Sequence, residues 1–390
     1  MKKIALLGYG NVGQGVYAIL DEQQPRLSQA VGCGMEVAAI LVRNRHKERD
    51  IPPDSGLLTD SLDAVLAHGQ IDAVADTTGD TALGYRMAKA ALEQGIHFIT
   101  AGKTLVSRHM EELSALAERR DAHFLYEASV AGGIPLLKPL RKLSLLGDVT
   151  QVRGIINGSC NHILSGMSEE GRTFSDMMAE ARALGYLETD PSDDINGWDT
   201  RRKLRILATL AFGGTVQEDD IPCEGIARIR QQDIRTLQDA GRTLRLLGRA
   251  KKDGDRVMAS VFPCALAAGD TLSGIRGVSN HVEVKSAYVG WVGFSGPGAG
   301  RYPTAHAMVS DLVDALSGRK SKKSPLGSAA LTATGLMETG VFYLRGDDLP
   351  HGLAERRLGN GWLTHPVALG DVMAWLQTDA HAVAVLMALY

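Results

Sequence analysis

A glycine loop near the start of the chain decides what its first domain can be. Segment Gly8–Gly13, with the sequence GYGNVG, directly follows the apolar run Lys3–Leu7 and opens an amphipathic stretch. A G-x-G-x-x-G loop between a strand and a helix is typical of βαβ units that bind the pyrophosphate of a dinucleotide. A glycine-rich turn without a ligand is the alternative, but three glycines at this spacing carry an entropic cost that folding alone does not require. The expected cofactor contacts come from Gly8, Gly10, Asn11, Val12 and Gly13.

The first 130 residues alternate short β-type runs with amphipathic helical stretches. Such alternation predicts an α/β domain with a parallel, doubly wound sheet of the Rossmann type. The expected strands are Lys3–Leu7, Glu36–Val42, Ala73–Asp76, Phe98–Thr100 and His123–Tyr126, and the expected helices begin near Val12, Ala82 and Glu111.

After Gly132 the pattern changes to longer helical stretches, such as Thr173–Leu184 and Asp199–Ala211, with β-type runs at Val257–Cys264 and His281–Val289. This predicts a second domain of mixed α+β structure. Residues 317–328 are polar and basic without periodicity, which indicates a solvated linker before the last sixty or so residues.

Composition limits the partners of the chain. Its 390 residues carry 42 Lys and Arg against 45 Asp and Glu, so the net charge of -3 offers no broad cationic field for nucleic acid or anionic lipid. The four cysteines lie far apart, without the spacing of a zinc site or the density of a disulfide scaffold. No apolar run is long enough for a signal sequence or a membrane span. We therefore expect a cytoplasmic protein that acts on small molecules.

The end of the second strand predicts which dinucleotide binds. Chains that prefer NAD usually place an acidic side chain there, where it binds the ribose 2′-hydroxyl. Segment Leu41–Lys47, with the sequence LVRNRHK, has cations instead. Such cations would bind a 2′-phosphate, so we predict NADP over NAD, with Arg43 as a contact. A basic loop that is only solvated is the alternative.

An acidic segment stands in the second domain. Five carboxylates lie within the twelve residues Glu188–Asp199, and Lys203 follows. So dense a cluster repels itself unless cations or amines occupy it. Pro191 and the adjacent Asp193 and Asp194 break the register of an EF-hand calcium loop. Asp199 and Lys203 are four residues apart on one helix face, where a plain surface ion pair would contribute only about 0.2–0.5 kcal/mol.

Six motifs in the same order resemble those of homoserine dehydrogenase, over roughly residues 1–316. They are the glycine loop, Thr100–Lys103 (TAGK), Tyr126–Pro135 (YEASVAGGIP), Gly154–Asn161 (GIINGSCN), Gly185–Pro191 (GYLETDP) through Asp199 and Lys203, and Gly298–Ala305 (GAGRYPTA). The resemblance implies reversible reduction of L-aspartate 4-semialdehyde to L-homoserine with a nicotinamide cofactor, a step of threonine and methionine biosynthesis.

The resemblance also implies roles for single residues. Glu188 and Asp199 match the family's substrate-binding acids, and Asp194 matches an acid near the reacting end of the substrate. Hydride delivered to an aldehyde carbon leaves an alkoxide that needs a proton donor. Lys203 matches the family's proposed donor, and Lys103 matches a second lysine between cofactor and substrate. Two nearby ammonium groups lower each other's pKa and stabilise a developing oxyanion.

Two positions near Lys103 qualify this match. Relatives have Asn or a similarly polar residue where Gly102 stands here, and loss of that amide changes how the nicotinamide or the substrate hydroxyl would be held beside Lys103. Thr78 matches a cofactor-contacting threonine of the family, and a turn at the end of a strand is the alternative.

The segment after Tyr126 resembles the family's monovalent cation site. The resemblance implies a sodium ion held by the carboxylate of Glu127 and the backbone carbonyls of Val130, Gly132 and Ile134. A hard cation favours such oxygens. A tight turn between domains would use the same glycines without an ion.

The end of the chain is expected to return to the nucleotide domain and then add a short module. Gly298 resembles a small residue beside the nicotinamide half of the cofactor, with interdomain packing as the alternative. Residues after the linker resemble a degenerate ACT domain, from which we expect no threonine inhibition. The resulting boundaries are 1–130 for the NAD(P)-binding domain, 131–300 for a catalytic domain that also forms a homodimer, 301–316 for a returning helix, 317–328 for the linker and 329–390 for the ACT-like segment.

Two other functions fit parts of the pattern. A dehydrogenase of the same fold could reduce a different amino-acid semialdehyde, since Gly102, His162 and Trp198 are unusual neighbours for the site. A catalytically silent NADP-binding sensor would need neither the acid at 199 nor the lysine at 203.

Overall fold

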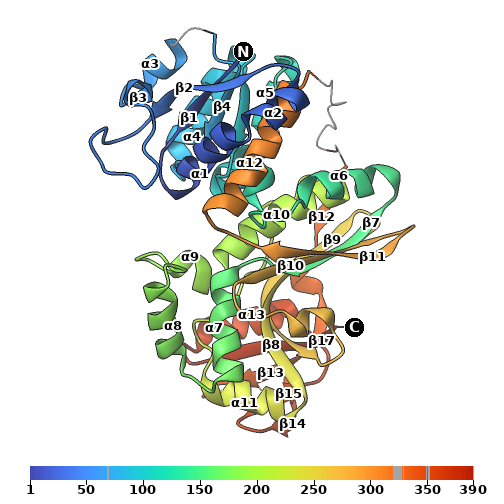
Figure 1. The fold of residues 1–390 in the computed structure, drawn as a ribbon. Helices are drawn as coiled ribbons and strands as arrows, with labels where there is room; N and C mark the ends of the chain where they lie inside the picture. Colours follow the sequence, from blue (N-terminus) through green and yellow to red (C-terminus); the bar gives the residue numbers. More distant parts are fainter. Residues whose placement is uncertain (68–69, 319–326, 328, 348, 350–351, 390) are drawn as a thin grey trace. The chain divides into compact units, whose positions relative to one another are not determined.

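The computed structural model describes residues 1–67, 70–318, 327, 329–347, 349 and 352–389, which form two compact units (Figure 1). The first unit comprises residues 1–141 and 297–328, and the second comprises residues 142–296 and 329–390. Most of the expected linker, 319–326 and 328, lies outside the described residues.

The first unit contains a six-stranded parallel sheet, which confirms the predicted Rossmann-type α/β fold. Its strand order is β3-β2-β1-β4-β5-β6. Strands β2 and β3 are added on one side of β1 and strands β4 to β6 on the other, so the switch point of the sheet lies between β1 and β4. The strands are β1 (Lys2–Leu7), β2 (Met35–Leu41), β3 (Leu58–Thr59), β4 (Ala73–Asp76), β5 (His97–Thr100) and β6 (Phe124–Leu125). The helices are α1 (Asn11–Glu22), α2 (Gln24–Val31), α3 (Leu62–Ala67), α4 (Thr81–Glu93) and α5 (Lys103–Arg119), with 3-10 turns η1 (Ser55–Leu57) and η2 (Glu127–Ser129).

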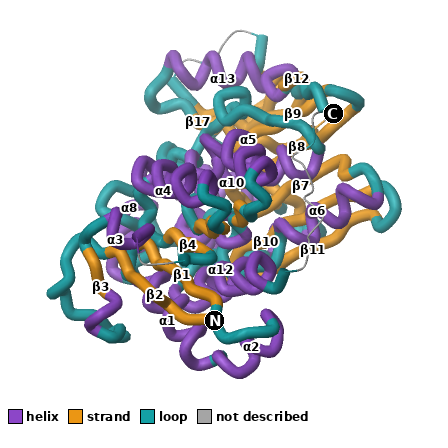
Figure 2. The backbone as a smooth tube through the Cα atoms, turned by 90° about the horizontal axis from the view of Figure 1, so that it is seen from above, coloured by secondary structure: helices purple, strands orange, loops and turns teal. Residues whose placement is uncertain are grey.

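A helix from much later in the sequence completes this unit. Helix α12 (Arg301–Leu316) packs against α1, and its Met308 and Leu312 are fully buried in the core that contains Ile4 and Val16. At the other end of α1, the loop after α2 runs beside the N terminus, where Lys2 donates its N–H to the carbonyl of Gly34 at 2.7 Å (Figure 2). The sheet is therefore covered by segments nearly 300 residues apart in the chain.

The second unit is built on a mixed sheet, which confirms the predicted mixed domain. Its main strand order is β11-β10-β7-β8-β9-β17-β13-β15-β14, and helices α7, α10 and α11 pack against β8. These elements are β7 (Val149–Ile155), α7 (Gly158–Glu169), α8 (Phe174–Ala183), α9 (Ser192–Ile195), α10 (Trp198–Phe212), α11 (Gln231–Asp239), β8 (Arg242–Asp253), β9 (Arg256–Ala267), η3 (Thr271–Gly274), β10 (Ser279–Ser286) and β11 (Gly290–Pro297). Helix α6 (Leu137–Leu146) precedes them.

The last residues of the chain continue this sheet. Their elements are β12 (Thr332–Ala333), η4 (Gly335–Met337), β13 (Thr339–Arg345), β14 (Ala354–Leu358), β15 (Gly361–Thr364), β16 (Val367–Ala368), α13 (Leu369–Thr378) and β17 (Val383–Leu389). Strand β17 pairs with β9 and β13, and between β13 and β14 the described residues contain no helix. The resemblance of this segment to an ACT domain stays a prediction.

A buried ion pair fixes the segment to the rest of the unit. Arg345, at the end of β13, contacts both carboxylate oxygens of Asp233 on α11, at 2.6 and 2.9 Å. Asp233 is fully buried, and the hydroxyl of Tyr343 donates to it at 3.1 Å.

One expected helix start is wrong. The third helix of the first unit was expected near Glu111, but α5 begins at Lys103. Leu105, Val106 and Met110 are buried on it together with Leu113, so the apolar face extends two turns further toward the N terminus than the charged stretch after 111 indicates.

Candidate active site

The glycine loop lies between β1 and α1. Gly8 adopts a φ of +87°, and a Cβ on Gly13 would stand 2.5 Å from the carbonyl oxygen of Gly8. By contrast, a Cβ on Gly10 would have no protein atom within 4 Å. Helix α1 begins at Asn11, so its first N–H groups face the loop. The open side at Gly10 and the helix N-terminus together suit a pyrophosphate.

A cavity of about 610 Å³ opens beside this loop, within the usual size of cofactor sites. Gly8, Gly10, Arg43 and Thr78, four of the predicted cofactor contacts, line it. Arg43 is largely exposed and lies 3.3 Å from Asp80. The lining also includes Lys47, one of the cations of the predicted segment, and two basic side chains outside that segment, Arg49 and Arg86.

A buried carboxylate organises the ends of β4 and β5. The Oδ1 atom of Asp76 accepts the hydroxyl and the N–H of Thr78, at 2.7 and 3.0 Å. Its Oδ2 atom accepts the hydroxyl of Thr100 at 2.9 Å, and that hydroxyl accepts the N–H of Gly102 at 2.9 Å. Burial raises the pKa of Asp76. Lys103, the first residue of α5, follows this network directly, so Asp76 positions both of the neighbouring predicted contacts.

The predicted cation loop is a sharp, buried turn. Ala131 and Gly132 both adopt left-handed conformations, with φ of 58° and 51°. Glu127 is buried, and its carboxylate accepts the N–H groups of Leu136, Leu137 and Lys138 at 2.6, 2.7 and 3.0 Å. In the described part of the chain, no hydrogen bond is found to the carbonyl oxygens of Val130, Gly132 and Ile134, the other residues of the predicted cation site.

Glycine residues allow the segment that precedes and begins α12 to pack closely against the turn of residues 131–134. A Cβ on Gly132 would stand 2.3 Å from the carbonyl oxygen of Gly298, and one on Gly133 would stand 2.6 Å from the ring of Pro303. At the start of α12, Arg301 donates to the side chain of Asn11 at 2.7 Å. Gly298 therefore lies in the first unit beside the loop of residues 131–134, and α12 begins next to Asn11 of the glycine loop.

In the second unit, an acid and a lysine form a buried pair. Lys203 donates from Nζ to Oδ2 of Asp199 at 2.7 Å and to the carbonyl of Ile156 at 2.8 Å. The side chain of Asp199 is 2% exposed and that of Lys203 is 13% exposed. A plain surface ion pair is therefore excluded, because both charges have left bulk solvent.

Asn157 links this pair to a second predicted acid. It lies between β7 and α7, and its Nδ2 donates to Asp194 Oδ1 at 2.6 Å and to Asp199 Oδ2 at 2.8 Å. Asn157 belongs to one of the six sequence motifs, but the sequence alone indicates no role for it. The signal that could have indicated one is its position at the end of a strand, immediately before a helix.

The other carboxylates of the acidic segment have different surroundings. Asp193 contacts Arg202 at 2.6 Å, and Asp190 accepts the hydroxyl of Ser192 at 2.5 Å. Glu188 lies exposed in the loop between α8 and α9. The structure thus brings Asp194, Asp199 and Lys203 together and leaves Glu188 on the surface.

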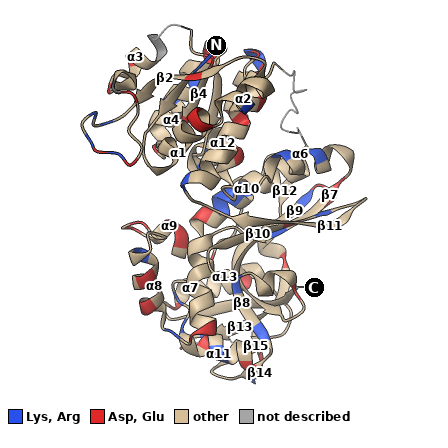
Figure 3. Ribbon diagram, viewed as in Figure 1, with Lys and Arg blue, Asp and Glu red and all other residues tan. Residues whose placement is uncertain are grey.

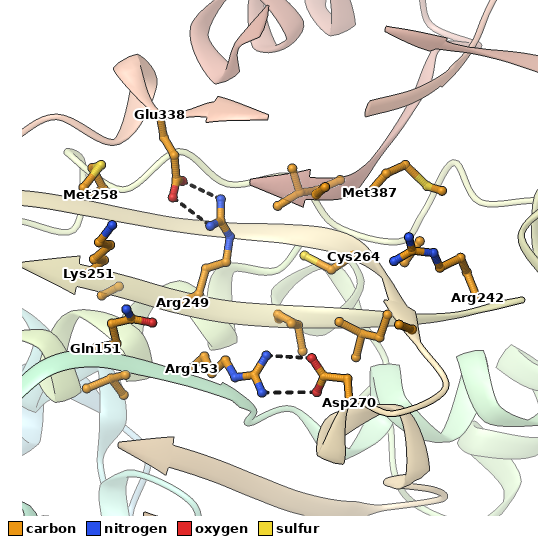
Figure 4. Close-up of a pocket in the computed structure, with 18 of the residues that line it drawn as sticks. Gln151, Arg153, Arg242, Arg249, Lys251, Met258, Cys264, Asp270, Glu338 and Met387 are labelled. Carbon is orange, nitrogen blue, oxygen red and sulfur yellow. Dashed lines mark hydrogen bonds and ion pairs between the residues drawn. The ribbon is translucent and has the colours of Figure 1, made fainter. Parts of the chain in front are cut away.

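Figure 4 shows a second cavity, of about 320 Å³, over strands β7, β8 and β9. Its central arginines are engaged in ion pairs, Arg249 with Glu338 and Arg153 with Asp270. Because Glu338 immediately precedes β13, the first pair ties the C-terminal segment to β8. Both ion pairs therefore connect elements of the second unit.

Three general expectations can be compared with the structure. Among the described residues, no group of three or more His, Cys, Asp or Glu side chains is placed to hold a metal ion. None of the helices in the described ranges has the length and apolar character needed to cross a bilayer. Both basic and acidic side chains are spread over the ribbon of each unit (Figure 3).

Two family models match the chain. The model described as homoserine dehydrogenase, NAD binding domain, covers residues 8–127, and the model described as homoserine dehydrogenase covers residues 135–313. The homoserine dehydrogenase of Neisseria gonorrhoeae is 36% identical over 311 residues, covering 80% of this chain and 71% of that protein. That of Corynebacterium glutamicum is 38% identical over 319 residues, covering 80% and 71%.

Solved structures agree with the sequence matches. A homoserine dehydrogenase from Thiobacillus denitrificans superposes with a TM-score of 0.89 at 29% identity, covering 99% of this chain and 98% of the other. A hyperthermophilic archaeal homoserine dehydrogenase mutant in complex with NADPH superposes with a TM-score of 0.68 at 27% identity, covering 81% and 98%. The chain therefore belongs to the homoserine dehydrogenase family, the NAD(P)-dependent oxidoreductases that interconvert L-homoserine and L-aspartate 4-semialdehyde.

Proposed function

We propose that the cluster of Asp194, Asp199 and Lys203 is the catalytic centre of this enzyme, and that it serves threonine and methionine biosynthesis. The observation that carries the proposal is the buried pair of Lys203 and Asp199. Removing two charges from water is costly, and a buried ion pair contributes little net stability. Buried charged groups are, however, common at functional sites, where the chemistry needs them. A silent cofactor sensor would require neither.

Lys203 is proposed as the proton donor. Two of the three N–H bonds of its ammonium are directed to Asp199 and Ile156, which fixes the position of Nζ. The remaining N–H can then point to the substrate oxygen. When bound, the nicotinamide dinucleotide supplies the hydride that the aldehyde carbon accepts. Lys203 transfers its proton to the resulting alkoxide oxygen, and homoserine forms. Lys103, which matches the second lysine of the family, is proposed to stabilise that oxygen.

The acids are proposed to select an amino-acid substrate. Asp194 and Asp199 would attract the α-ammonium group, with Glu188 closing from its exposed loop. Cofactor absorbance should be followed with L-homoserine and with analogues one carbon shorter and one carbon longer. We expect a kcat/KM for homoserine at least tenfold above that for either homologue. In a shorter or longer substrate the hydroxyl group would be displaced and could not accept the hydrogen bond from Lys203. Faster turnover of a homologue would assign the enzyme to a different semialdehyde.

The residues of the first unit fit a dinucleotide, and we propose NADP as the preferred one. Asn11, Val12 and the three glycines of the loop would hold the pyrophosphate, and Thr78 and Gly298 the nicotinamide half. Arg43, with Lys47 and Arg49 on the same cavity wall, would bind the 2′-phosphate. The NADPH complex of the archaeal relative agrees with this choice. A Michaelis constant for NAD below that for NADP would contradict it.

A monovalent cation, sodium in the first instance, is proposed at the turn after Glu127. The carbonyl oxygens of Val130, Gly132 and Ile134 are hard ligands of the required kind, and the buried carboxylate of Glu127 adds negative charge. Exchange of sodium and potassium for a bulky organic cation should lower both activity and Tm. Unchanged values of both after complete exchange would remove the cation from the site.

A homodimer is proposed through the second unit. Tyr288 and Val289, at the turn between β10 and β11, and Trp291 on β11 are exposed, and so are Leu145 and Leu146 at the end of α6. A Cβ on Gly147 would touch the ring of Tyr288, so these side chains form one apolar surface. Sedimentation velocity should show a dimer that Tyr288→Glu weakens. A monomer at all concentrations would contradict the proposal.

A further inference from the structure

The orientation of the Asn157 side chain is fixed by the helix that follows it. Its Oδ1 accepts the N–H of Cys160 at 2.8 Å and so caps α7. An amide has its acceptor on one side and its two donors on the other. Because Oδ1 is committed to the helix, the NH₂ group must face the carboxylates of Asp194 and Asp199. One side chain therefore holds one acid of α9 and one of α10.

Electrostatics explains what this bridge can do. Two carboxylates brought close together repel each other, and the usual outcome is that one takes up a proton. A neutral amide that donates to both stabilises the two anions without adding a charge. The nearby thiol of Cys160 adds none either, because burial raises its pKa well above the ordinary value.

The bridge also shares an atom with the proton donor. Oδ2 of Asp199 accepts hydrogen bonds from Asn157 at 2.8 Å and from Lys203 at 2.7 Å. When Lys203 gives up its proton, its attraction to Asp199 weakens. The bond from Asn157 does not depend on that proton and keeps Asp199 in place throughout the cycle.

We propose that Asn157 is a positioning residue of the active site, which holds Asp194 and Asp199 as an ionised pair facing the amino group of the substrate. This inference rests on the proposed function of that cluster. It predicts that loss of the amide impairs substrate binding more than the chemical step, so the KM for homoserine rises more than kcat falls.

Two substitutions at this position separate capping from bridging. Asn157→Ser keeps an oxygen that can cap α7 but loses the NH₂ group. We expect its Tm to stay near that of the wild type, while kcat/KM for homoserine falls about 10- to 100-fold. Dinucleotide affinity, measured by quenching of NADPH fluorescence, should be unchanged because the loop that binds it belongs to the other unit.

Asn157→Asp keeps the shape and the cap but places a third carboxylate against two others. The titratable groups that face this position are Cys160 on α7, Asp194 on α9, and Asp199 and Lys203 on α10. We expect a larger loss at pH 8 than for Asn157→Ser. The ratio of variant to wild-type kcat/KM should recover as the pH falls below 6, because the introduced carboxyl group, once protonated, can again donate one hydrogen bond. A purely structural role would give no such recovery.

Thr173→Ala is the matched control. Thr173 caps α8 in the same unit through its hydroxyl, so this variant loses a helix cap at a position away from the cluster. We expect a lower Tm and an unchanged kcat/KM. If Asn157→Ser retains kcat/KM within twofold of the wild type while Lys203→Ala is inactive, the bridging role is wrong and the catalytic cluster stands. If Asn157→Ser does not fold, Asn157→Asp provides the test. A ratio of variant to wild-type kcat/KM that does not change with pH then overturns the inference. If the wild type does not oxidise homoserine, the proposed function itself fails.

Discussion

The two units present their functional groups in different ways. The first presents backbone, namely N–H groups at the start of α1, an open face at Gly10 and carbonyls in the turn after Glu127. The second presents charged side chains that have been withdrawn from water, Asp199 and Lys203 above all. Backbone sites depend on where glycine occurs and can be recognised from spacing. Buried charges depend on contacts between distant elements, which spacing alone does not reveal.

The largest effect that separates the units should come from Lys203→Met. This change removes the proposed proton donor, and positioned acid catalysis contributes about 10²- to 10⁴-fold in rate. We expect kcat to fall by that factor, while the dissociation constant of NADPH stays the same. Steady-state kinetics and fluorescence titration measure the two quantities. Equal kcat values for variant and wild type would move the proton donor elsewhere.

Stability should distinguish the units next. Arg345→Met leaves the fully buried carboxylate of Asp233 without its ion-pair partner, which costs about 3–5 kcal/mol. Urea unfolding followed with probes in each unit should show the second unit unfolding earlier while the first still binds NADPH. Arg172→Met is the control, because its partly exposed pair with Glu180 contributes at most about 1 kcal/mol. Similar losses from both variants would show that the pair of Asp233 and Arg345 does not anchor the C-terminal segment.

Two glycines of one loop should respond in opposite ways. Gly10→Ala places a methyl group in open space on the pyrophosphate side, so we expect an unchanged Tm and a 10- to 100-fold weaker NADPH affinity, about 1.4–2.8 kcal/mol. Gly13→Ala places it 2.5 Å from the carbonyl oxygen of Gly8, so the backbone must shift and Tm falls. Thermal scans with and without NADPH measure both effects. A stable Gly13→Ala variant with full affinity would contradict the packing of this loop.

The smallest effect is a pH dependence of the first unit. Burial, with a contribution from the nearby charge of His123, lowers the pKa of His97 from 6.5 to about 4. Its Nδ1 accepts the N–H of His123 at 3.1 Å, which only an unprotonated nitrogen can do. The unfolded chain takes up this proton at higher pH than the folded chain, so stability declines as the pH falls from 6.5 to 4.

His97→Asn keeps an acceptor at this position and removes the titration. Between pH 7 and pH 4.5 we expect it to lose roughly 1 kcal/mol less unfolding free energy than the wild type, a value reduced for the partial exposure of the ring. Urea unfolding at the two pH values provides the comparison. Parallel losses in both proteins would place the acid sensitivity at other groups.

Much of the first unit could be predicted from the sequence because its determinants are local. Strand β4 has the expected bounds Ala73–Asp76, and α1 begins one residue from the expected position. The start of α5 was misplaced because residues 103–110 mix polar and β-branched side chains, and only their burial shows that the helix extends through them. The network around Asp76 was missed because its partners, Thr78 and Thr100, come from two different strand ends.

In the second unit, the sequence indicated which residues belong to the candidate site but not which residues they contact. Asp199 and Lys203 were selected by resemblance, and their spacing alone would have favoured a surface pair. Asn157 had no role until its amide was placed between α9 and α10. The continuation of the sheet by β17 depends on pairing with β9, more than a hundred residues earlier in the sequence, and no local pattern encodes such a partner.

The position of α12 has a consequence for how the protein folds during its synthesis. Met308 and Leu312 fill the centre of the nucleotide-binding core, yet they are synthesised after the whole run of strands β7 to β11. Domains usually fold from the N terminus as they leave the ribosome. Here the core of the N-terminal sheet is incomplete, and part of its apolar face stays exposed, until α12, which ends at Leu316, has left the ribosome. A chaperone that shields this face during translation would therefore be of most use to the half of the enzyme made first.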